Sequence, residues 1–467
     1  MSKDDPAGTG AKGHRPTRLT LDRLRKHVDK GEIDTVVCAF TDMQGRLQGK
    51  RLHAPYFLDV VLDHGTEGCN YLLAVDVDMN TVGGYAMSGW ERGYGDFEFA
   101  LDLDTLRYTP GEAATATVQC DLVWLDGSGP VAQSPRTILK EQVAAAAESG
   151  WTAFAGTELE FIVFEESYEQ AWDSGYRGLT GANRYNVDYS IVGGHRVEPV
   201  LRDIRLEMHR AGMVVEGTKG ECNLGQHEIG FLYDELLRTC DNHVVYKTGA
   251  KQIAAEHGRS LTFMAKYDQR EGNSCHIHLS LRGADGETVF ADDSRDGGRS
   301  ELFDSFLAGL LATMRELTYF YAPNINSYKR FAAGSFAPTA VAWGTDNRTC
   351  ALRVVGHGAG LRVENRVPGG DVNPYLATAA MLAGGLHGIR EGLVLPEACV
   401  GNAYVGDYEH VPSTLAEARE LLAGSAFARA AFGDEVVDHY VNAADVEITA
   451  FNAAVTDWER VRGFERL

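Results

Sequence analysis

Charged side chains at a spacing of two, set inside otherwise apolar runs, limit the fold of this chain more than any other feature. These groups are Glu158 and Glu160 in FAGTELEFIVF, His276 and His278 in SCHIHLSL, and Arg362, Glu364 and Arg366 in LRVENRV. Residues i and i+2 of a strand point to the same face of a sheet. Charges on an inward face are costly unless they are paired or bind a metal. The pattern therefore predicts strands whose polar side chains gather at one site.

Each group taken alone has a plainer interpretation. An E-x-E pair is usually a solvated strand face, an H-x-H pair is usually two hydrogen-bonded polar residues, and R-x-E-x-R can be a surface ion-pair ladder. The three groups occur together, however, and each lies in apolar sequence where solvated charges are not expected. Glu221 and Glu228 flank a glycine turn in ECNLGQHEIGF and add two more carboxylates. We therefore interpret these residues as one functional site.

The composition excludes several classes of function. The 467-residue chain has 66 acidic and 44 basic side chains, a formal net charge of −22, which argues against nucleic-acid binding because that requires a basic surface. The negative charge suits a cationic small-molecule substrate, although solubility explains it equally well. The eight cysteines include no C-x-x-C pair and the N-terminus is polar, so we expect a cytoplasmic protein. The longest weakly polar stretch, residues 375–389, is too short and too interrupted to span a membrane.

We expect an α+β fold with three regions. Residues 1–16 are polar and without periodicity, and they predict a disordered arm. Residues 17–110 predict a compact α+β unit that ends at the turn Thr109–Glu112. Residues 111–467 predict a catalytic domain in which strands arrive in clusters between helices. That order indicates an antiparallel sheet flanked by helices and not a doubly wound fold.

Several elements can be predicted individually. Thr20 is expected to cap a helix that stops at Gly31, and a hairpin is expected to turn at residues 42–45, followed by a short helix near 57–62 and a strand near 71–75. In the larger domain we expect helices near 135–149, 197–211, 234–257, 300–321, 373–392 and 435–460. The expected strands are 151–164, 213–218, 226–232, 260–266, 273–282, 349–355 and 360–367.

The chemistry of the charged groups indicates divalent metals and phosphoryl transfer. Five glutamates and one histidine form a hard, oxygen-rich ligand set that suits Mg²⁺ or Mn²⁺ rather than zinc or copper. In phosphoryl transfer, metals and guanidinium groups neutralise developing charge. The guanidinium groups would come from Arg330, Arg348, Arg353, Arg362 and Arg366. The phosphate loop G-x-x-x-x-G-K-[ST] is missing, so a nucleotide would be bound by another architecture.

Five longer motifs carry a resemblance to a known family. They are EGTKGECNLGQHEIGF, NSCHIHLS, NSYKRF, APTAVAWGTDNRTCALRV and RVENRVPGGDVNPYLATAAML. In this order they are similar to the motifs of the type I glutamine synthetase superfamily, from about residue 20 to the end of the chain. The resemblance implies an N-terminal β-grasp domain followed by the catalytic domain. It also implies a homo-oligomer, a dodecamer of two stacked hexameric rings, with sites between neighbouring subunits.

The resemblance implies roles for individual residues. One metal would be held by Glu160, Glu221 and Glu228, and a second by Glu158, His276 and Glu364. The family positions that hold ATP match Glu216, His278, Ser280, Arg348 and Arg353. Arg353 also matches the catalytic position that neutralises the transferring phosphoryl group. The positions that hold glutamate match Gly272, Arg330, Arg348 and Arg366, where arginine suits bidentate contact with a carboxylate.

Two departures from glutamine synthetase concern the acceptor. The family segment F-D-G-S-S, whose aspartate helps to draw in ammonium, is replaced by VDVDMNTVGGYAMSGW, in which Asp78 aligns within an altered loop. The family flap P-G-Y-E-A-P reads AGSFAP, so Phe336 stands in place of the glutamate that takes a proton from ammonium. A phenyl ring cannot take a proton, but it can line a pocket for methylenes or lie over an ammonium group. We therefore expect an amine pocket that includes Phe336 and Asp78.

The sequence predicts an ATP-dependent ligase that joins the γ-carboxylate of L-glutamate to a primary amine larger than ammonia, through γ-glutamyl phosphate. It resembles the γ-glutamyl-polyamine, γ-glutamyl-putrescine and γ-glutamyl-ethanolamide synthetases, with a polyamine such as putrescine or spermidine favoured and ethanolamine open. An ordinary glutamine synthetase and a catalytically inactive regulator of the same family stay open as alternatives. The base that takes the proton of the amine is not identified, although Asp76 and Asp78 are candidates. Tyr404 lies near the adenylylated tyrosine of bacterial glutamine synthetases, but its flanking residues differ, so no such modification is expected.

Overall fold

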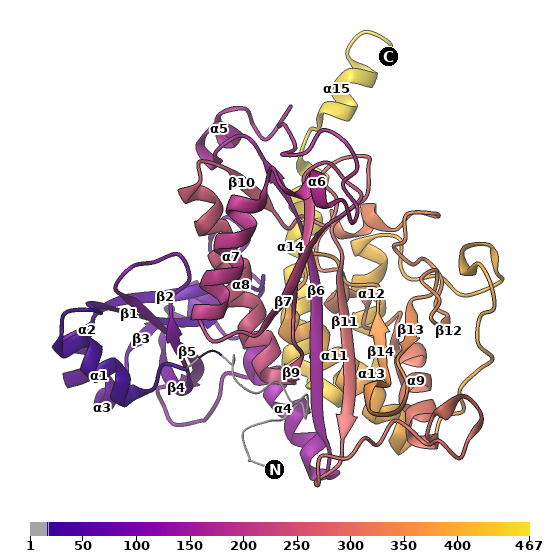
Figure 1. Ribbon diagram of the computed structural model, residues 1–467, viewed down its shortest axis with the longest axis horizontal. Helices are drawn as coiled ribbons and strands as arrows, with labels where there is room; N and C mark the ends of the chain where they lie inside the picture. The colour runs from indigo at the N-terminus through magenta and orange to yellow at the C-terminus, as the bar shows by residue number, and fades with distance from the viewer. Residues whose placement is uncertain (1–15, 17) are drawn as a thin grey trace.

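The structure, a computed structural model, describes residue 16 and residues 18–467. The predicted disordered arm, residues 1–16, lies outside the described residues except for its last residue. The described chain forms an N-terminal unit around a five-stranded sheet and a larger unit around a nine-stranded sheet, both accompanied by helices (Figure 1). The predicted α+β fold class is confirmed.

The N-terminal sheet has the strand order β2-β1-β5-β4-β3. Its strands are β1 (Thr35–Thr41), β2 (Leu47–His53), β3 (Glu67–Cys69), β4 (Asp96–Tyr108) and β5 (Thr115–Trp124). β1 and β5 are parallel, whereas the other pairs are antiparallel. This mixed sheet, preceded by the helix α1 (Leu21–Asp29), is consistent with the predicted β-grasp domain.

Most local predictions for the N-terminal unit are confirmed. The Thr20 side chain caps α1 by accepting a hydrogen bond from the Arg23 N–H, and Gly31 follows the helix with a φ of +70°. β1 and β2 form the predicted hairpin, and at its turn the Asp42 carboxylate accepts a hydrogen bond from the Gln44 N–H. The predicted short helix is one continuous helical segment made of α2 (Ala54–Tyr56), η1 (Phe57–Val61) and α3 (Leu62–His64).

The structure departs from two predictions in this unit. The expected strand at 71–75 is instead a 3₁₀ turn, η2 (Asn70–Leu73), which is followed by a hydrogen bond from the Ala74 N–H to the Tyr71 carbonyl. A short apolar run without a period of two fits a turn as well as a strand. The expected boundary at 109–112 is the turn between β4 and β5. The N-terminal sheet therefore continues to Trp124, and the first unit ends after that residue and not at 110.

The larger sheet contains a path of strands in the order β12-β13-β14-β11-β6-β8-β7, and β9 and β10 also pair with β6. The strands are β6 (Thr152–Phe164), β7 (Val215–Gly220), β8 (Gln226–Phe231), β9 (Asp234–Glu235), β10 (Ser260–Thr262), β11 (Cys275–Arg282), β12 (Trp343–Thr345), β13 (Leu352–Val355) and β14 (Arg362–Asn365). Every pair is antiparallel except β12 with β13. The predicted antiparallel sheet is confirmed.

Helices pack against this sheet, and in Figure 1 α11 and α14 stand behind β6 and β11. The helices of the larger unit are α4 (Pro135–Glu148), α5 (Tyr168–Asp173), α6 (Ile191–Gly194), α7 (Glu198–Arg210), α8 (Leu236–Glu256), α9 (Glu301–Thr313), α10 (Thr318–Tyr321), α11 (Pro374–Arg390), α12 (Leu415–Gly424), α13 (Ala426–Phe432), α14 (Asp434–Ala453) and α15 (Asp457–Gly463). α11 is buried on all sides because it packs against both α4 and α9. Among the described residues, no helix combines the length and the apolar character needed to cross a bilayer.

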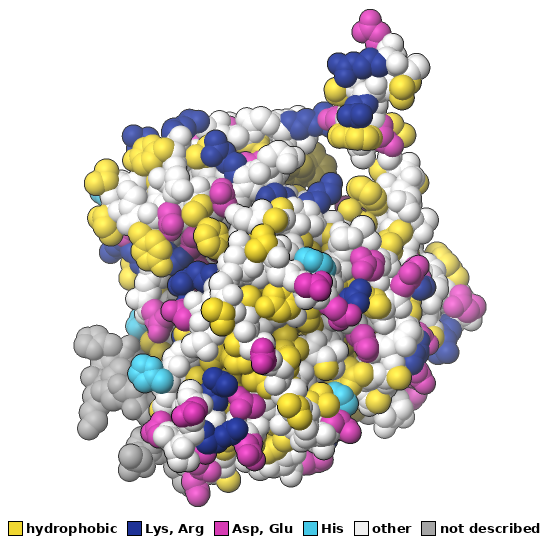
Figure 2. Space-filling model, turned by 90° about the vertical axis from the view of Figure 1, so that its right-hand side faces the viewer, with side chains coloured by type: hydrophobic (Ala, Val, Ile, Leu, Met, Phe, Trp, Pro, Cys, Tyr) yellow, Lys and Arg dark blue, Asp and Glu magenta, His cyan; other side chains and the backbone are white. Residues whose placement is uncertain are grey.

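The predicted helix at 435–460 is broken into α14 and α15. Thr456 and Glu459 form a capping box that starts α15 as a separate helix. α15 projects from the body of the molecule (Figures 1 and 2). Its apolar side chains stand in solvent: Trp458 is 68% exposed and Val461 is 71% exposed.

A buried arginine joins the two units. Arg136 of α4 is 2% exposed. Its guanidinium lies 2.6 Å from Asp102 of β4, 2.7 Å from Asp121 of β5 and 3.0 Å from Asp241 of α8. Because a buried charge is costly without partners, this network holds strands β4 and β5 of the N-terminal sheet against the helices of the larger unit.

Candidate active site

The strand register brings the predicted charged groups together on the larger sheet. The directly opposed pairs are Glu158 with His276, Glu364 with His278, and Glu160 with Glu228. Directly opposed residues present their side chains on the same face. Strands β8, β6, β11 and β14 therefore carry one continuous polar surface, as the spacing of two predicts.

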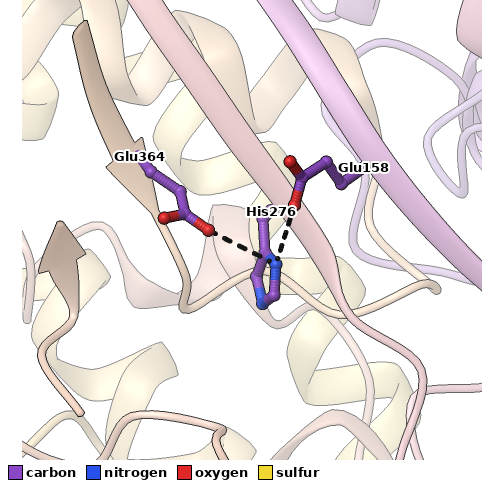
Figure 3. Close-up of side chains that lie close together, drawn as sticks. All are labelled: Glu158, His276 and Glu364. Atoms are coloured by element: carbon purple, nitrogen blue, oxygen red, sulfur yellow. Dashed lines mark hydrogen bonds and ion pairs between the residues drawn. The ribbon is translucent and has the colours of Figure 1, made fainter. Parts of the chain in front are cut away.

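Glu158, His276 and Glu364 form the histidine cluster. Figure 3 shows the three side chains pointing toward one another from three neighbouring strands. His276 Nδ1 lies 3.3 Å from Glu158 Oε2 and 3.5 Å from Glu364 Oε1. His276 Nε2 is buried and has no hydrogen-bond partner within the part of the chain that the structure describes. Burial, reinforced by the charge of Arg366, lowers the pKa of His276, which favours the neutral imidazole that ligates metals.

The carboxylates of the histidine cluster are ionised. Burial acts to raise the pKa of Glu158, but hydrogen bonds from His276 and His278 outweigh it and hold that pKa well below its usual range. Burial opposes ionisation of the fully buried Glu364 as well, yet the electrostatic influence of the His276 imidazole and the Arg366 guanidinium lowers its pKa. The two carboxylates are thus kept ionised by the imidazoles and the guanidinium group that face them.

His278 is fixed by an arginine on the next strand. Arg362 Nε donates to His278 Nδ1 at 3.2 Å, and His278 Nε2 lies 2.9 Å from Glu158 Oε1. Because Nδ1 accepts, Nε2 carries the proton and donates to the carboxylate. Arg362 therefore sets the tautomer and the ring orientation of His278.

Glu160, Glu221 and Glu228 form the carboxylate cluster, with one oxygen from each lying within 4.8 Å of the others. The Lys219 ammonium contacts Glu221 and lies 3.5 Å from Glu228 Oε2. Burial raises the pKa of Glu228 to about 8; Lys219 opposes this, and the neighbouring carboxylates Glu158 and Glu160 add to it. Three carboxylates this close need a cation, and Lys219 supplies one.

The two clusters fit the divalent ions that the sequence predicts. Each has three ligand atoms close enough to share one ion, and five carboxylates with one imidazole are the hard donors that Mg²⁺ and Mn²⁺ prefer. Of the two neighbouring cysteines, Cys275 is fully buried, and burial raises its pKa to about 12, so it is a packed, protonated thiol and not a ligand. Cys222 is less buried and donates to Asp188 Oδ2 at 3.6 Å.

A cavity of about 350 Å³ opens beside the clusters. One end is lined by Glu158, Glu228 and His278, and three of the residues that the resemblance assigns to ATP, Glu216, His278 and Ser280, all lie on its wall. The other end is lined by Phe154, Tyr233 and Arg282. The Arg282 guanidinium lies 5.3 Å from the centre of the Phe154 ring, and Nη2 donates to the Tyr233 hydroxyl at 3.0 Å. The cavity thus has an acidic end and a flat, aromatic end.

Three of the residues expected to hold glutamate lie close together. The Gly272 carbonyl accepts a hydrogen bond from Gln226, whose amide also donates to Glu160 at 3.1 Å. A Cβ at Gly272 would lie 2.1 Å from the Ala265 carbonyl oxygen, so only glycine fits. Arg330 is 2% exposed and donates to the Val367 and Arg366 carbonyls.

Arg366 completes this group. Its Nη1 lies 2.5 Å from Glu364 Oε1, and its Nε is buried without a hydrogen-bond partner among the described residues. Arg366 thus touches the histidine cluster and still has an N–H group to offer to a ligand.

The other two predicted arginines occupy different places. Arg353 Nη1 donates to Glu364 Oε2 at 2.9 Å, which puts this guanidinium beside the histidine cluster. Arg348 is 56% exposed and lies in the loop between β12 and β13, 4.0 Å from Asp346. Arg348 does not line the cavity that holds Glu216, His278 and Ser280.

The structure does not bring the two expected amine-pocket residues together in one chain. Phe336 is 58% exposed at the tip of the flap, residues 333–338, and Arg366 Nη2 donates to its carbonyl at 3.5 Å. Asp78 is exposed in the N-terminal unit, in a turn where the Asp76 carboxylate accepts from the Asp78 N–H. Burial and the charges of Asp76 and Asp78 raise the pKa of Glu447 on α14, so this turn faces α14.

Sequence reasoning missed Lys219, Phe154, Tyr233 and Arg282. A signal for two of them was present in the same spacing of two. Lys219 precedes Glu221 by two residues, and Arg282 continues the alternation of His276, His278 and Ser280 along β11. Phe154 and Tyr233 could be placed only once the register of β6 and the path of β9 were known.

Comparison with known proteins identifies the family. The profile described as "Glutamine synthetase, catalytic domain" matches residues 132–462. The chain is 65% identical over 449 residues to the γ-glutamylethanolamide synthetase GlnA4 of Streptomyces coelicolor, which covers 96% of each chain. It is 37% identical over 445 residues to the glutamate–isopropylamine ligase of a Pseudomonas species, covering 94% of this chain and 97% of the relative.

The fold has a solved counterpart. A structure of a GmaS/ADP complex aligns with a TM-score of 0.83 at 26% sequence identity, covering 95% of this chain and 99% of that one. The fold, the two acidic clusters and the sequence relatives therefore agree on one family.

Proposed function

The chain belongs to the glutamine synthetase family, and from this membership we propose that it joins the γ-carboxylate of L-glutamate to a primary amine larger than ammonia, at the expense of ATP. The observation that carries the proposal is Phe336 at the tip of the flap, where the family resemblance expects an acid, while both acidic clusters are complete. Two relatives support it, one named for a γ-glutamylethanolamide product and the other for joining glutamate to isopropylamine. We place ethanolamine first because the relative at 65% identity is named for it; putrescine and spermidine stay predictions.

The residues of the two clusters are proposed to hold Mg²⁺ or Mn²⁺. Glu160, Glu221 and Glu228 would hold one ion, and Glu158, His276 and Glu364 the other. Bound ions would supply positive charge against the γ-phosphoryl group. Arg362 contributes by holding His278 against Glu158, which leaves His276 as the imidazole free to ligate.

ATP is proposed to lie in the 350 Å³ cavity. Its aromatic end, Phe154 with Tyr233, offers flat faces on which a base can stack, and its acidic end adjoins both clusters. The phosphates would then point toward Arg353 and the carboxylates. Arg348 lies outside this cavity, on the loop between β12 and β13, and would contact the phosphates from there.

The reaction is proposed to follow two steps. A γ-carboxylate oxygen of glutamate attacks the γ-phosphorus of ATP, ADP leaves, and Arg353 stabilises the charge on the transferred group. The amine nitrogen then attacks the γ-carbonyl carbon of γ-glutamyl phosphate, inorganic phosphate leaves, and an amide forms. An alkylamine has a pKa near ~10.4 in water, so one proton must leave before the attack. We propose that Asp76 or Asp78 of a neighbouring subunit accepts this proton, because in one chain these residues belong to the N-terminal unit and the flap belongs to the larger unit.

Assembly into a homo-oligomer, a dodecamer of two hexameric rings, is proposed on two grounds. The expected amine-pocket residues Phe336 and Asp78 lie on different units of one chain. The projecting helix α15 exposes apolar side chains that a neighbouring subunit could cover. The eight free cysteines support the proposal of a cytoplasmic location.

The test is product formation with amines offered side by side. The enzyme with ATP, glutamate and Mg²⁺ should release phosphate and form a γ-glutamyl amide, identified by mass spectrometry, with ethanolamine, putrescine or spermidine. Glutamine as the preferred product would instead indicate an ordinary glutamine synthetase. ATP binding without any amide, with any amine or ammonium, would indicate an inactive regulator.

A further inference from the structure

The segment from Cys399 to Tyr404 joins two parts of the candidate active site. The Asn347 side chain, next to Arg348, donates to the Cys399 carbonyl at 3.3 Å and to the Gly401 carbonyl at 2.8 Å. The Ala403 N–H donates to Thr349 Oγ1 at 2.9 Å. The segment is therefore fixed to the loop that carries Arg348.

At its end the same segment reaches the flap. The Tyr404 hydroxyl donates to the Ala337 carbonyl at 2.9 Å. Its backbone N–H donates to Asn402 Oδ1 at 3.0 Å, which fixes the start of the turn that carries it. Burial raises the pKa of Tyr404, so the hydroxyl stays protonated and donates. The nearby guanidinium groups of Arg366 and Arg330 partly oppose this shift.

The bond from Tyr404 is made where the flap backbone is strained. Phe336 has a φ of +58°, in the left-handed region that bulky residues seldom adopt. The carbonyls of Phe336 and Ala337 are held by two different residues, Arg366 at 3.5 Å and Tyr404 at 2.9 Å. A strained residue persists only where its surroundings determine its conformation. These two hydrogen bonds lie immediately after the strained residue.

We propose that Tyr404 is a positioning residue that latches the flap and so holds Phe336 at the amine pocket. This inference rests on the proposed function, because it assigns Tyr404 a part in selecting the amine as the acceptor. With the latch made, the flap stands between γ-glutamyl phosphate and water. With the latch lost, water competes with the amine, and γ-glutamyl phosphate is hydrolysed to glutamate and phosphate. The latch also uses the hydroxyl that adenylylation would require.

Tyr404→Phe tests the latch because it removes one hydroxyl and keeps the ring. The matched control is Tyr408→Phe, since the Tyr408 ring lies just beyond that segment and packs beside Cys350 and Cys399. For Tyr404→Phe we expect kcat/KM for the amine to fall roughly threefold to tenfold, the range of one hydrogen bond. The KM for ATP should not change, and phosphate released per amide formed should rise by a similar factor. Tyr408→Phe should behave as the unaltered enzyme.

Two results would overturn the latch. One is a Tyr404→Phe enzyme with the same phosphate-to-amide ratio as the Tyr408→Phe enzyme. The other is an equal rise in KM for ATP and for the amine, which a general loosening of the fold would cause. The proposed function is tested separately on the unaltered enzyme. It fails if that enzyme forms no amide with any amine offered. In that case, the Tyr404→Phe and Tyr408→Phe enzymes can still be compared by the phosphate that each releases with glutamate and ATP in the absence of amine.

Discussion

The ammonium group of Lys219 lies 3.5 Å from Oε2 of Glu228 and also contacts Glu221. One lysine therefore faces two of the three carboxylates in the cluster that we propose as a metal site. The Lys219 ammonium group and a divalent ion would compete for the same carboxylate oxygens. A metal that binds there has to displace the lysine, which can then turn toward the Tyr189 ring 5.3 Å away.

Lys219→Met should tighten metal binding and weaken the metal-free fold. The affinity for Mn²⁺, measured by calorimetry, should rise about tenfold because about 1.4 kcal/mol of competing ion pairing is removed. Without metal, Glu221 and Glu228 would repel each other, so the melting temperature should fall. Lys50→Met, at an exposed position on β2, is the control. An unchanged Mn²⁺ affinity would show that Lys219 does not compete with the metal at this cluster.

Glu160→Ala should abolish phosphate release. Glu160 accepts hydrogen bonds from the Ser274 N–H at 2.7 Å and from Gln226 at 3.1 Å, so its carboxylate is rigidly placed in the carboxylate cluster. Loss of a ligand leaves phosphoryl charge uncompensated, and we expect a decrease of about 100-fold or more in saturating Mg²⁺. Glu165→Ala, at the exposed end of the same run, should retain activity. Near-normal turnover of Glu160→Ala would contradict the two-metal assignment.

Acid should weaken the fold through two buried histidines. Burial lowers the pKa of His243 and of His439 to about 3 from an ordinary value of 6.5. Below pH 6.5 the unfolded chain binds a proton at each position and the folded chain does not. The free energy of unfolding is therefore largest above pH 6.5 and falls as the pH drops toward 3, by up to about 1.4 kcal/mol per pH unit for each histidine.

His439→Gln should make this dependence shallower. The His439 ring packs at a tilt against Tyr85 of the N-terminal unit, with ring centres 4.6 Å apart, so its protonation would also loosen α14 from that unit. Urea unfolding at several pH values between 4 and 6.5 measures the slope. His209→Gln, at an exposed position on α7, is the control. If the free energy of unfolding depends on pH with the same slope in both variants, His439 does not contribute to the acid sensitivity of the fold.

Removal of α15 should reduce the size of the assembly. The chain mass is 50.9 kDa, and light scattering of the active enzyme should give a multiple of it. A chain ending at Ala453 lacks the exposed Trp458, Val461 and Phe464 and should form a smaller species. An active species of 50.9 kDa from the full chain would contradict assembly altogether.

The parts of the site that could be predicted are those fixed by strand periodicity. A period of two decides which residues share a face, so the glutamates, histidines and arginines of β6, β11 and β14 could be grouped from sequence. The antiparallel sheet followed from strands that arrive in clusters. Thr20 could be predicted as a cap because capping depends on one residue and its immediate neighbours.

The rest depends on contacts between distant segments. The position of the Lys219 ammonium depends on how a long side chain turns toward Glu228 on the neighbouring strand. The bond between Tyr404 and Ala337 joins residues 67 positions apart in the chain. Pro110 and Gly111 suit a linker between domains and equally a tight turn between two strands of one sheet. The sequence alone therefore could not distinguish a boundary from a turn near residue 110.

The ratio of kcat/KM for ethanolamine to that for ammonium, with ATP and glutamate saturating, tests the central claim most directly. Phe336 stands in the place of an acid, so the unaltered enzyme should favour ethanolamine. Phe336→Glu should lower the ratio by raising ammonium use, whereas Ala333→Glu, which adds an acid at another exposed position of the flap, should leave it unchanged. An unaltered enzyme that prefers ammonium to ethanolamine and to every polyamine offered would contradict the account.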